Sequence, residues 1–132
     1  GPWSSLVGAA REYTGLPTVH LIFRLDRETS GVVVLAKDAR MASRLQTAMQ
    51  ERRVKKGYLV ILTGELRAPV TVDQPLGDDT ASPVYVKTTV RADGRAAVTH
   101  FEPIATGGGF TLARVRLETG RKHQIRAHAL WL

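Results

Sequence analysis

A single carboxylate, that of Asp26, lies between Arg24 and Arg27 in a short link between two apolar runs of the sequence. A guanidinium within contact distance favours the ionised form of a carboxylate, whereas desolvation favours the protonated form. A carboxylate held in such surroundings can act as a nucleophile or as a general base. An exposed turn laced with ion pairs would use the same residue types, and the Arg-Leu-Asp-Arg string taken alone favours that alternative.

A second group of polar side chains follows Gly120 near the end of the chain. If a helix begins at Gly120, its free backbone amides, Arg121 and Arg126 would converge on a site for a phosphate or a carboxylate. Ile125 and Ala129 are expected to face the core. That would place Arg126 beside a half-buried edge, where an arginine needs an anionic partner.

His123 and His128 are five positions apart, a poor spacing for two metal ligands on one helical face, so no metal site is expected. A histidine near a helix start is often a capping or core residue. Arg121 and Lys122 could simply be solvated.

Tyr58 enters an apolar run directly after Lys55, Lys56 and a glycine. An aromatic ring with a hydroxyl beside a basic cluster can stack on an extruded base. A tyrosine that packs in the core of a sheet is the alternative.

The elements that position these residues follow from the spacing of apolar residues and from turn signals. A helix is expected over 3–13 with Ser4 or Ser5 as its N-cap, and another from the cap Asp38 to about Arg52. An apolar stripe on the second helix consists of Met41, Ala42, Leu45, Ala48 and Met49. Strands are expected over 19–25, 32–36, 58–62, 70–72, 84–90, 96–101 and 110–117, with turns at 29–31 and 93–94 and a last helix from Gly120 onward. The run 32–36 is continuous and β-branched, as in a strand that is covered on both faces.

The chain has 132 residues, and 43% of them are hydrophobic, which is enough for a real core. Nineteen Lys and Arg against twelve Asp and Glu give a net charge of +7, which points to a polyanionic partner such as nucleic acid. The absence of cysteine excludes disulfides and thiolate metal sites and fits a reducing compartment. No membrane span and no signal peptide are recognised, so a cytoplasmic protein is expected.

Three segments, RLDRETSG at 24–31, KKGYLVILTG at 55–64 and LETGRKHQIRAH at 117–128, closely resemble the RluA-like family of RNA pseudouridine synthases. The resemblance extends from about Trp3 to His128 and includes GRAAVT at 94–99. An isolated RLDR string is a weak signal, whereas three such segments in this order are highly specific.

The resemblance implies that Asp26 is the catalytic aspartate and that Arg24 enters the RNA stack where the target base has left it. It implies that Tyr58 packs against the flipped uracil and that Arg126 pairs with the catalytic carboxylate. Enzymes of this family convert uridine to pseudouridine without a metal or another cofactor, and the expected substrate is a uridine in ribosomal or transfer RNA. The residues expected to contact RNA are Arg24, Arg27, Lys55, Lys56, Arg121, Lys122, His123 and Gln124.

The expected fold is an α+β domain, a mixed and largely antiparallel sheet with flanking helices, of the pseudouridine synthase catalytic-domain type. All 132 residues are taken as this one domain, expected to be a monomer and to lack an S4-like RNA-binding domain. Phe23 stands where the family usually has histidine and Lys122 where it often has threonine, while family members normally continue beyond the point where Leu132 ends this sequence. Two other functions are compatible with the sequence: a noncatalytic RNA-binding module, and a different hydrolytic or transfer enzyme that uses Asp26 with His123.

Overall fold

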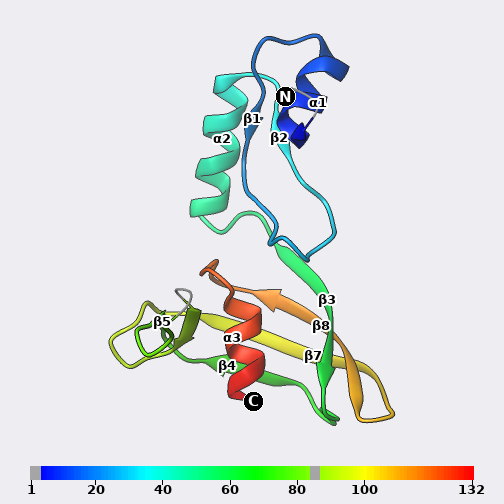
Figure 1. Ribbon diagram of the computed structural model, residues 1–132, viewed down its shortest axis with the longest axis vertical. Coiled ribbons are helices and arrows are strands. Elements are labelled where there is room, and N and C mark those ends of the chain that lie inside the picture. The colour runs from blue at the N-terminus through cyan, green and yellow to red at the C-terminus, as the bar shows by residue number, and fades with distance from the viewer. Residues whose placement is uncertain (1–3, 84–86) are drawn as a thin grey trace. The chain divides into compact units, whose positions relative to one another are not determined.

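The computed structural model describes residues 4–83 and 87–132, and the chain divides into two compact units, Gly1–Val54 and Lys55–Leu132 (Figure 1). Every strand pairing among the described residues is antiparallel, and helices accompany the strands in both units. The expected α+β class is therefore confirmed. Trp3, expected in the first helix, and residues 84–86, expected in a strand, lie outside the described residues.

The first unit contains two capped helices and a short two-stranded ladder. Its elements are α1 (Leu6–Thr14), β1 (His20–Leu21), β2 (Leu35–Ala36) and α2 (Ala39–Gln50). The Ser5 hydroxyl accepts the Gly8 amide at 3.1 Å, and Gly15 ends α1 in the left-handed conformation with φ of 69°. Asp38 caps α2 by accepting the Met41 amide at 2.7 Å. Both predicted N-caps are therefore confirmed, and α2 ends two residues before Arg52.

The apolar stripe on α2 is only partly covered. Ala42 is buried, Leu45, Ala48 and Met49 are half-buried, and Met41 is exposed. Consistent with this, α2 contacts both short strands.

The predicted strands over 19–25 and 32–36 are wrong in length, because the ladder pairs His20 with Ala36 and Leu21 with Leu35. One further hydrogen bond, from the Ile22 amide to the Val34 carbonyl at 3.2 Å, extends it. Val32 is 79% exposed, so the second run is not covered on both faces. A two-stranded ladder has no neighbouring strands to complete a buried sheet, and the β-branched composition of a run does not supply them.

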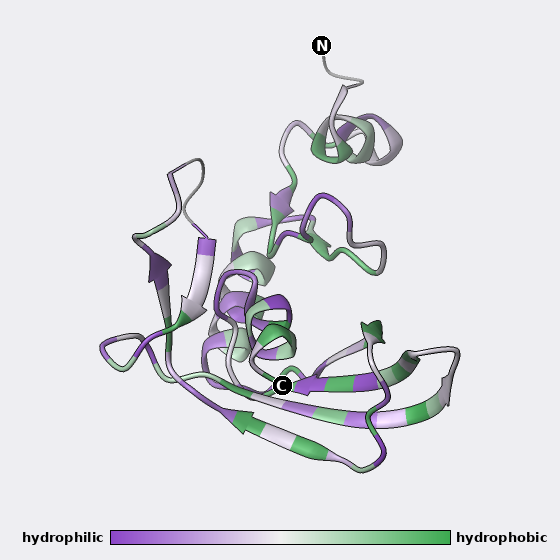
Figure 2. Cartoon of the chain, turned by 60° about the horizontal axis from the view of Figure 1, so that its bottom comes forward, coloured by the Kyte–Doolittle hydropathy of each residue, from purple (hydrophilic) through white to green (hydrophobic). Residues whose placement is uncertain are grey.

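The second unit is built on a four-stranded sheet in the order β3-β8-β7-β4. These strands are β3 (Lys56–Thr63), β4 (Val70–Asp73), β7 (Val98–Gly107) and β8 (Phe110–Leu117). Exposed residues alternate with buried or half-buried ones along β3 and β8, as expected where one face of a sheet is buried. Figure 2 shows hydrophobic and hydrophilic bands on the strands of this sheet. The buried face carries Val72, Phe101 and Val115, and helix α3 (Gln124–Trp131) packs Ile125 and Ala129 against them (Figure 1).

A smaller ladder of β5 (Leu76–Asp79) and β6 (Lys87–Val90) adjoins this sheet. Strand β5 is absent from the sequence prediction. The predicted turn at 93–94 is present, with the Gly94 amide donating to the Arg91 carbonyl at 2.9 Å. The residues that flank this turn, Val90 and Arg95, pair with Leu76 rather than with each other.

Gly94 lies against the backbone of Leu76, and a Cβ at position 94 would stand 2.5 Å from the Leu76 carbonyl carbon and oxygen. Only glycine allows this approach. The contact closes a second small core in which Leu76 packs with Ala97 and Ala127.

Candidate functional site

Asp26 opens a tight turn in the first unit. The Thr29 amide donates to the Asp26 carbonyl at 3.0 Å, which closes a four-residue turn with aspartate at its favoured first position. The side chain of Asp26 is exposed, as are those of Arg24 and Arg27. The expectation that a rigid strand end holds Asp26 is wrong, because β1 ends at Leu21 and the turn falls at 26–29 rather than at 29–31.

The basic start of β3 lies beside the glycine of the closing motif in the second unit. The Lys56 Nζ is 2.8 Å from the point that a Cβ on Gly120 would occupy, and Lys56 pairs across the sheet with Leu117. A glycine at 120 therefore gives the lysine side chain room. Two segments far apart in sequence, 55–64 and 117–128, thus lie side by side. Lys56 is half-buried at this contact, and its neighbour Lys55 is exposed.

Tyr58 is half-buried and packs against the core cluster of Val72, Phe101 and Val115. Its ring serves partly as a core side chain, which agrees with the structural alternative stated above. Part of the residue stays accessible, so packing does not preclude contact with a ligand.

The last helix begins at Gln124, so the prediction of a start at Gly120 is wrong. His123 precedes it in the left-handed conformation, with φ of 50°, and the side chain of His123 does not cap the helix. The Oε1 of Gln124 instead binds the segment before the helix, accepting the Arg121 amide at 3.0 Å and the Thr119 hydroxyl at 2.8 Å. The anion site expected at a helix beginning at Gly120 therefore loses its basis.

Gln124 is only 2% exposed and has a complete set of partners within the protein. Its Nε2 donates to the Val98 carbonyl at 3.0 Å and to the Thr99 hydroxyl at 2.9 Å. Since both the acceptor and the donor capacity of the amide are used within the protein, these contacts argue against the expected contact of Gln124 with RNA.

His128 completes this buried network from the next turn of α3. Its Nε2 lies 2.8 Å from the Gln74 carbonyl, which can only accept, so Nε2 carries a proton. Its Nδ1 lies 2.8 Å from the Thr99 hydroxyl, which donates to it when the imidazole is neutral. Burial lowers the pKa of His128, although the Gln74 carbonyl and the charge of Asp73 act in the opposite direction.

The structural role of His128 was missed in the sequence. The available signal was its spacing of four residues from Gln124, which places the two polar side chains on one face of α3.

The other basic residues of the closing motif differ in how far the protein already engages them. The Arg121 guanidinium donates from Nε to the Ala96 carbonyl at 3.0 Å, and Arg121 and His123 are half-buried. Lys122 and Arg126 are exposed, so the expected half-buried position of Arg126 is wrong. Ile125 and Ala129 do face the core as predicted, and Arg126 therefore projects from another side of α3.

The described residues 4–83 and 87–132 hold no group of three or more side chains suited to binding a metal ion. None of the helices within these residues is long and apolar enough to cross a membrane.

The three motif segments lie in an α+β chain, RLDRETSG in the first unit and the other two in the second. The family model described as RNA pseudouridylate synthase matches residues 5–131, and the chain belongs to this family. It is 40% identical to an RNA pseudouridine synthase of Bacillus subtilis (strain 168). The alignment extends over 116 residues and covers 87% of this chain and 40% of that protein. It is 36% identical to the ribosomal large subunit pseudouridine synthase D of Vibrio vulnificus (strain CMCP6), over 92% of this chain and 37% of that protein.

Two solved human structures share the fold. RNA Pseudouridylate Synthase Domain Containing 4 superposes with a TM-score of 0.76 and 29% identity, over 96% of this chain and 52% of that one. RNA Pseudouridylate Synthase Domain Containing 1 superposes with a TM-score of 0.83 and 23% identity, over 94% of this chain and 54% of that one. The chain thus spans well under two thirds of the length of these relatives.

Proposed function

We propose that the chain is the catalytic part of an RNA pseudouridine synthase that isomerises a specific uridine in ribosomal or transfer RNA. The observation that carries this proposal is the match of the family over residues 5–131, which includes all three motif segments. The name of the Vibrio relative refers to the large ribosomal subunit, which favours ribosomal RNA as the substrate. The net charge of +7 suits a polyanionic substrate.

In the proposed reaction the bond from ribose C1′ to N1 of uracil breaks, the base rotates, and a bond from C1′ to C5 forms. The proton on C5 is then lost and N1 gains one, so the change is an isomerisation with no net loss of atoms. A base inside folded RNA must leave its stack before this can happen.

Asp26 acts either as the nucleophile at the sugar or as the base that removes the ribose 2′ proton. Its exposed position on a tight turn supports access by a nucleotide. Tyr58 contacts the uracil, and its partial exposure is compatible with this role. For Arg126 we propose the role that the family resemblance implies, pairing with the catalytic carboxylate, which would favour its ionised form. Arg24 occupies the gap that the extruded base leaves.

The remaining exposed cations support the RNA backbone while the base is out of its stack. In this set we place Arg27, Lys55 and Lys122, each exposed in its own unit. Lys56, Arg121 and His123 are half-buried and belong to the set as secondary contacts. Gln124 is removed from it.

The test replaces Asp26 by asparagine, with Glu28→Gln as the matched control, because Glu28 is an exposed carboxylate in the same turn. The substrate is total RNA from a strain that lacks the enzyme, and pseudouridine is mapped before and after incubation. We expect conversion by the unaltered chain and by Glu28→Gln, and none by Asp26→Asn. RNA affinity should change by less than about twofold, since the substitution removes no cationic contact.

Conversion that survives in Asp26→Asn would overturn the catalytic assignment. RNA binding with no conversion by any variant would instead identify a noncatalytic RNA-binding module. Cleaved or transferred products in place of pseudouridine, lost as completely in His123→Ala as in Asp26→Asn, would favour a different transfer or hydrolytic chemistry.

A further inference from the structure

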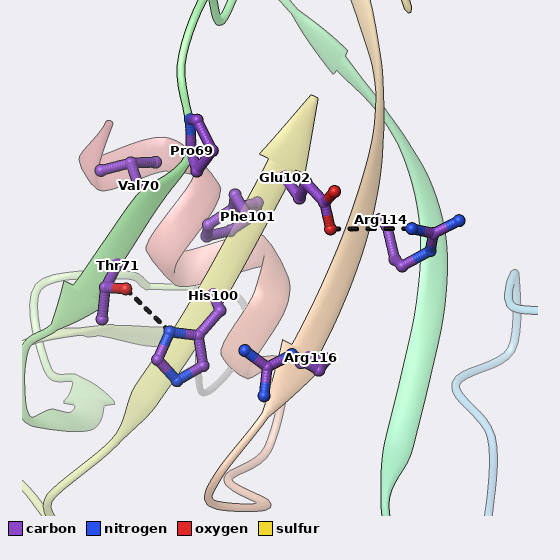
Figure 3. A pocket seen from close by; sticks show the side chains of 8 residues that line it. All are labelled: Pro69, Val70, Thr71, His100, Phe101, Glu102, Arg114 and Arg116. Carbon is purple, nitrogen blue, oxygen red and sulfur yellow. Dashed lines mark hydrogen bonds and ion pairs between the residues drawn. The ribbon is translucent and has the colours of Figure 1, made fainter. Parts of the chain in front are cut away.

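The face of the four-stranded sheet that is turned away from α3 has a hollow of about 250 Å³ (Figure 3). Its polar lining consists of Thr71, His100, Glu102, Arg114 and Arg116. None of these residues belongs to the set expected to contact RNA. Tyr58 and α3 pack on the opposite face of the sheet, so the hollow is separate from both of them.

The strand register aligns the side chains of the hollow in a row. Arg116 of β8 lies opposite Gly57 of β3 on one side and His100 of β7 on the other, and His100 lies opposite Thr71 of β4. A Cβ on Gly57 would meet nothing within 4 Å. The flank of Arg116 toward β3 is therefore open to a ligand.

The carboxylates near this row have partners other than Arg116. Glu102 pairs with Arg114 at 3.6 Å, as the dashed line in Figure 3 marks. Glu118 Oε1 lies 2.9 Å from His100 Nε2, and the Thr71 hydroxyl lies 2.7 Å from His100 Nδ1. These contacts fix the imidazole between a hydroxyl and a carboxylate.

Arg116 itself has no ion pair or side-chain hydrogen bond with the described residues. An arginine offers a planar fork of N–H donors that matches two oxygens of a phosphate. The hollow therefore contains two guanidinium groups. That of Arg116 has no ion pair within the described part of the chain, and that of Arg114 is only weakly paired, because its contact with Glu102 is long and exposed.

We propose that this hollow binds a phosphate group of the RNA backbone, with Arg116 as its main ligand and Arg114 as a second one. The proposal rests on the proposed function, because it adds a contact for RNA on the face of the sheet away from Tyr58. RNA is favoured over an acidic protein by the membership of the chain in an RNA-modifying family.

The experiment measures the affinity of the full chain for a labelled hairpin RNA by fluorescence anisotropy at several salt concentrations. We expect Arg116→Gln to weaken binding about three- to tenfold at about 0.1 M salt, and to reduce the slope of log K against log salt by about one. Arg116→Lys should retain most of the slope, because the charge is kept. The matched control is Arg67→Gln, since Arg67 is 85% exposed in the same unit and pairs locally with Glu65.

A second arm titrates inorganic phosphate and follows the Arg side-chain Nε–H signals by NMR. Shifts of the Arg116 signal with both phosphate and RNA support the proposal. A shift of the Arg116 signal with inorganic phosphate but not with RNA would overturn the assignment to RNA. Polyglutamate serves as a polyanion without phosphate, and if Arg116→Gln weakened the binding of polyglutamate and of RNA equally, that result would also overturn it.

RNA binding that Arg116→Gln leaves intact in both affinity and slope would overturn the pocket and leave the proposed function standing. Absence of any RNA binding by the unaltered chain would overturn both.

Discussion

Replacing Thr99 by valine tests the buried polar network directly. The Thr99 hydroxyl is fully buried, donates to His128 Nδ1 and accepts from Gln124 Nε2. Valine has nearly the same shape, so the change removes hydrogen bonds without opening a cavity. His128 Nδ1 is left without a donor, whereas Gln124 Nε2 keeps the Val98 carbonyl. One full and one partial loss of a buried partner should cost about 2–4 kcal/mol of the free energy of unfolding.

Urea unfolding followed by tryptophan fluorescence measures this cost. In a Trp3→Phe background Trp131 is the remaining tryptophan, and it lies in α3 next to the network. For a urea m-value of about 2 kcal/mol/M, the midpoint should fall by about 1–2 M. Thr63→Val is the control because Thr63 is exposed on β3, and its effect should stay within about 0.5 kcal/mol. A loss in Thr99→Val as small as that of the control would refute the account of the network.

Two further predictions concern the same unit. Gly94→Ala should lower the free energy of unfolding by about 1–3 kcal/mol or more, because the new Cβ would stand 2.5 Å from Leu76 backbone atoms. Gly57→Ala should be nearly neutral in the same denaturation assay, because a Cβ there meets nothing within 4 Å. Equal effects of the two changes would contradict the close approach of Gly94 to Leu76. Burial lowers the pKa of His128, so the native state binds fewer protons at this residue than the unfolded state does. The neutral, buried imidazole therefore contributes its full stabilisation above the unfolded-state pKa of about 6.5. That stabilisation is lost as the pH falls through the lower native-state pKa. Thermal melting between about pH 8 and 5 should show this loss in the unaltered chain, and a His128→Gln variant whose melting temperature falls just as steeply over that range would show that another group is responsible.

The second unit is the part of the fold that local patterns predict best. Strands β3 and β8 were predicted at 58–62 and 110–117, close to their observed bounds, although the apolar run of β3 does not reveal that Leu59 and Ile61 are exposed. The helix caps Ser5 and Asp38 were predicted for the same reason, since a cap depends on residues within one turn.

Other elements depend on partners that are distant in sequence. Strand β5 has the sequence Leu-Gly-Asp-Asp, which contains residues that are depleted in strands. It forms because Leu76 is bonded to Arg95 in both directions, at 2.8 and 2.9 Å, while β6 pairs along its other edge. The short β1 and β2 show the opposite case, in which apolar runs lack the neighbours that would extend them.

The candidate site divides in the same way. The types of Asp26, Tyr58 and Arg126 and the order of their segments pointed to the family, which the match over residues 5–131 confirms. The burial of Gln124 was not predictable from its position in a basic segment, because it depends on the carbonyl of Val98 and the hydroxyl of Thr99, more than twenty residues away.

The motif at the end of the chain therefore contains buried residues that stabilise the fold and exposed residues that can contact a ligand. Gln124 and His128 are buried and joined through Thr99, so their polar atoms hold α3 against β7 and against the Gln74 carbonyl. Lys122 and Arg126 are exposed on the same short segment and remain available to a ligand. Loss of a buried member should change stability together with activity, whereas loss of an exposed member should change binding or turnover with the fold intact. The burial of each residue thus separates structural roles from ligand-binding roles among neighbouring residues of one basic segment.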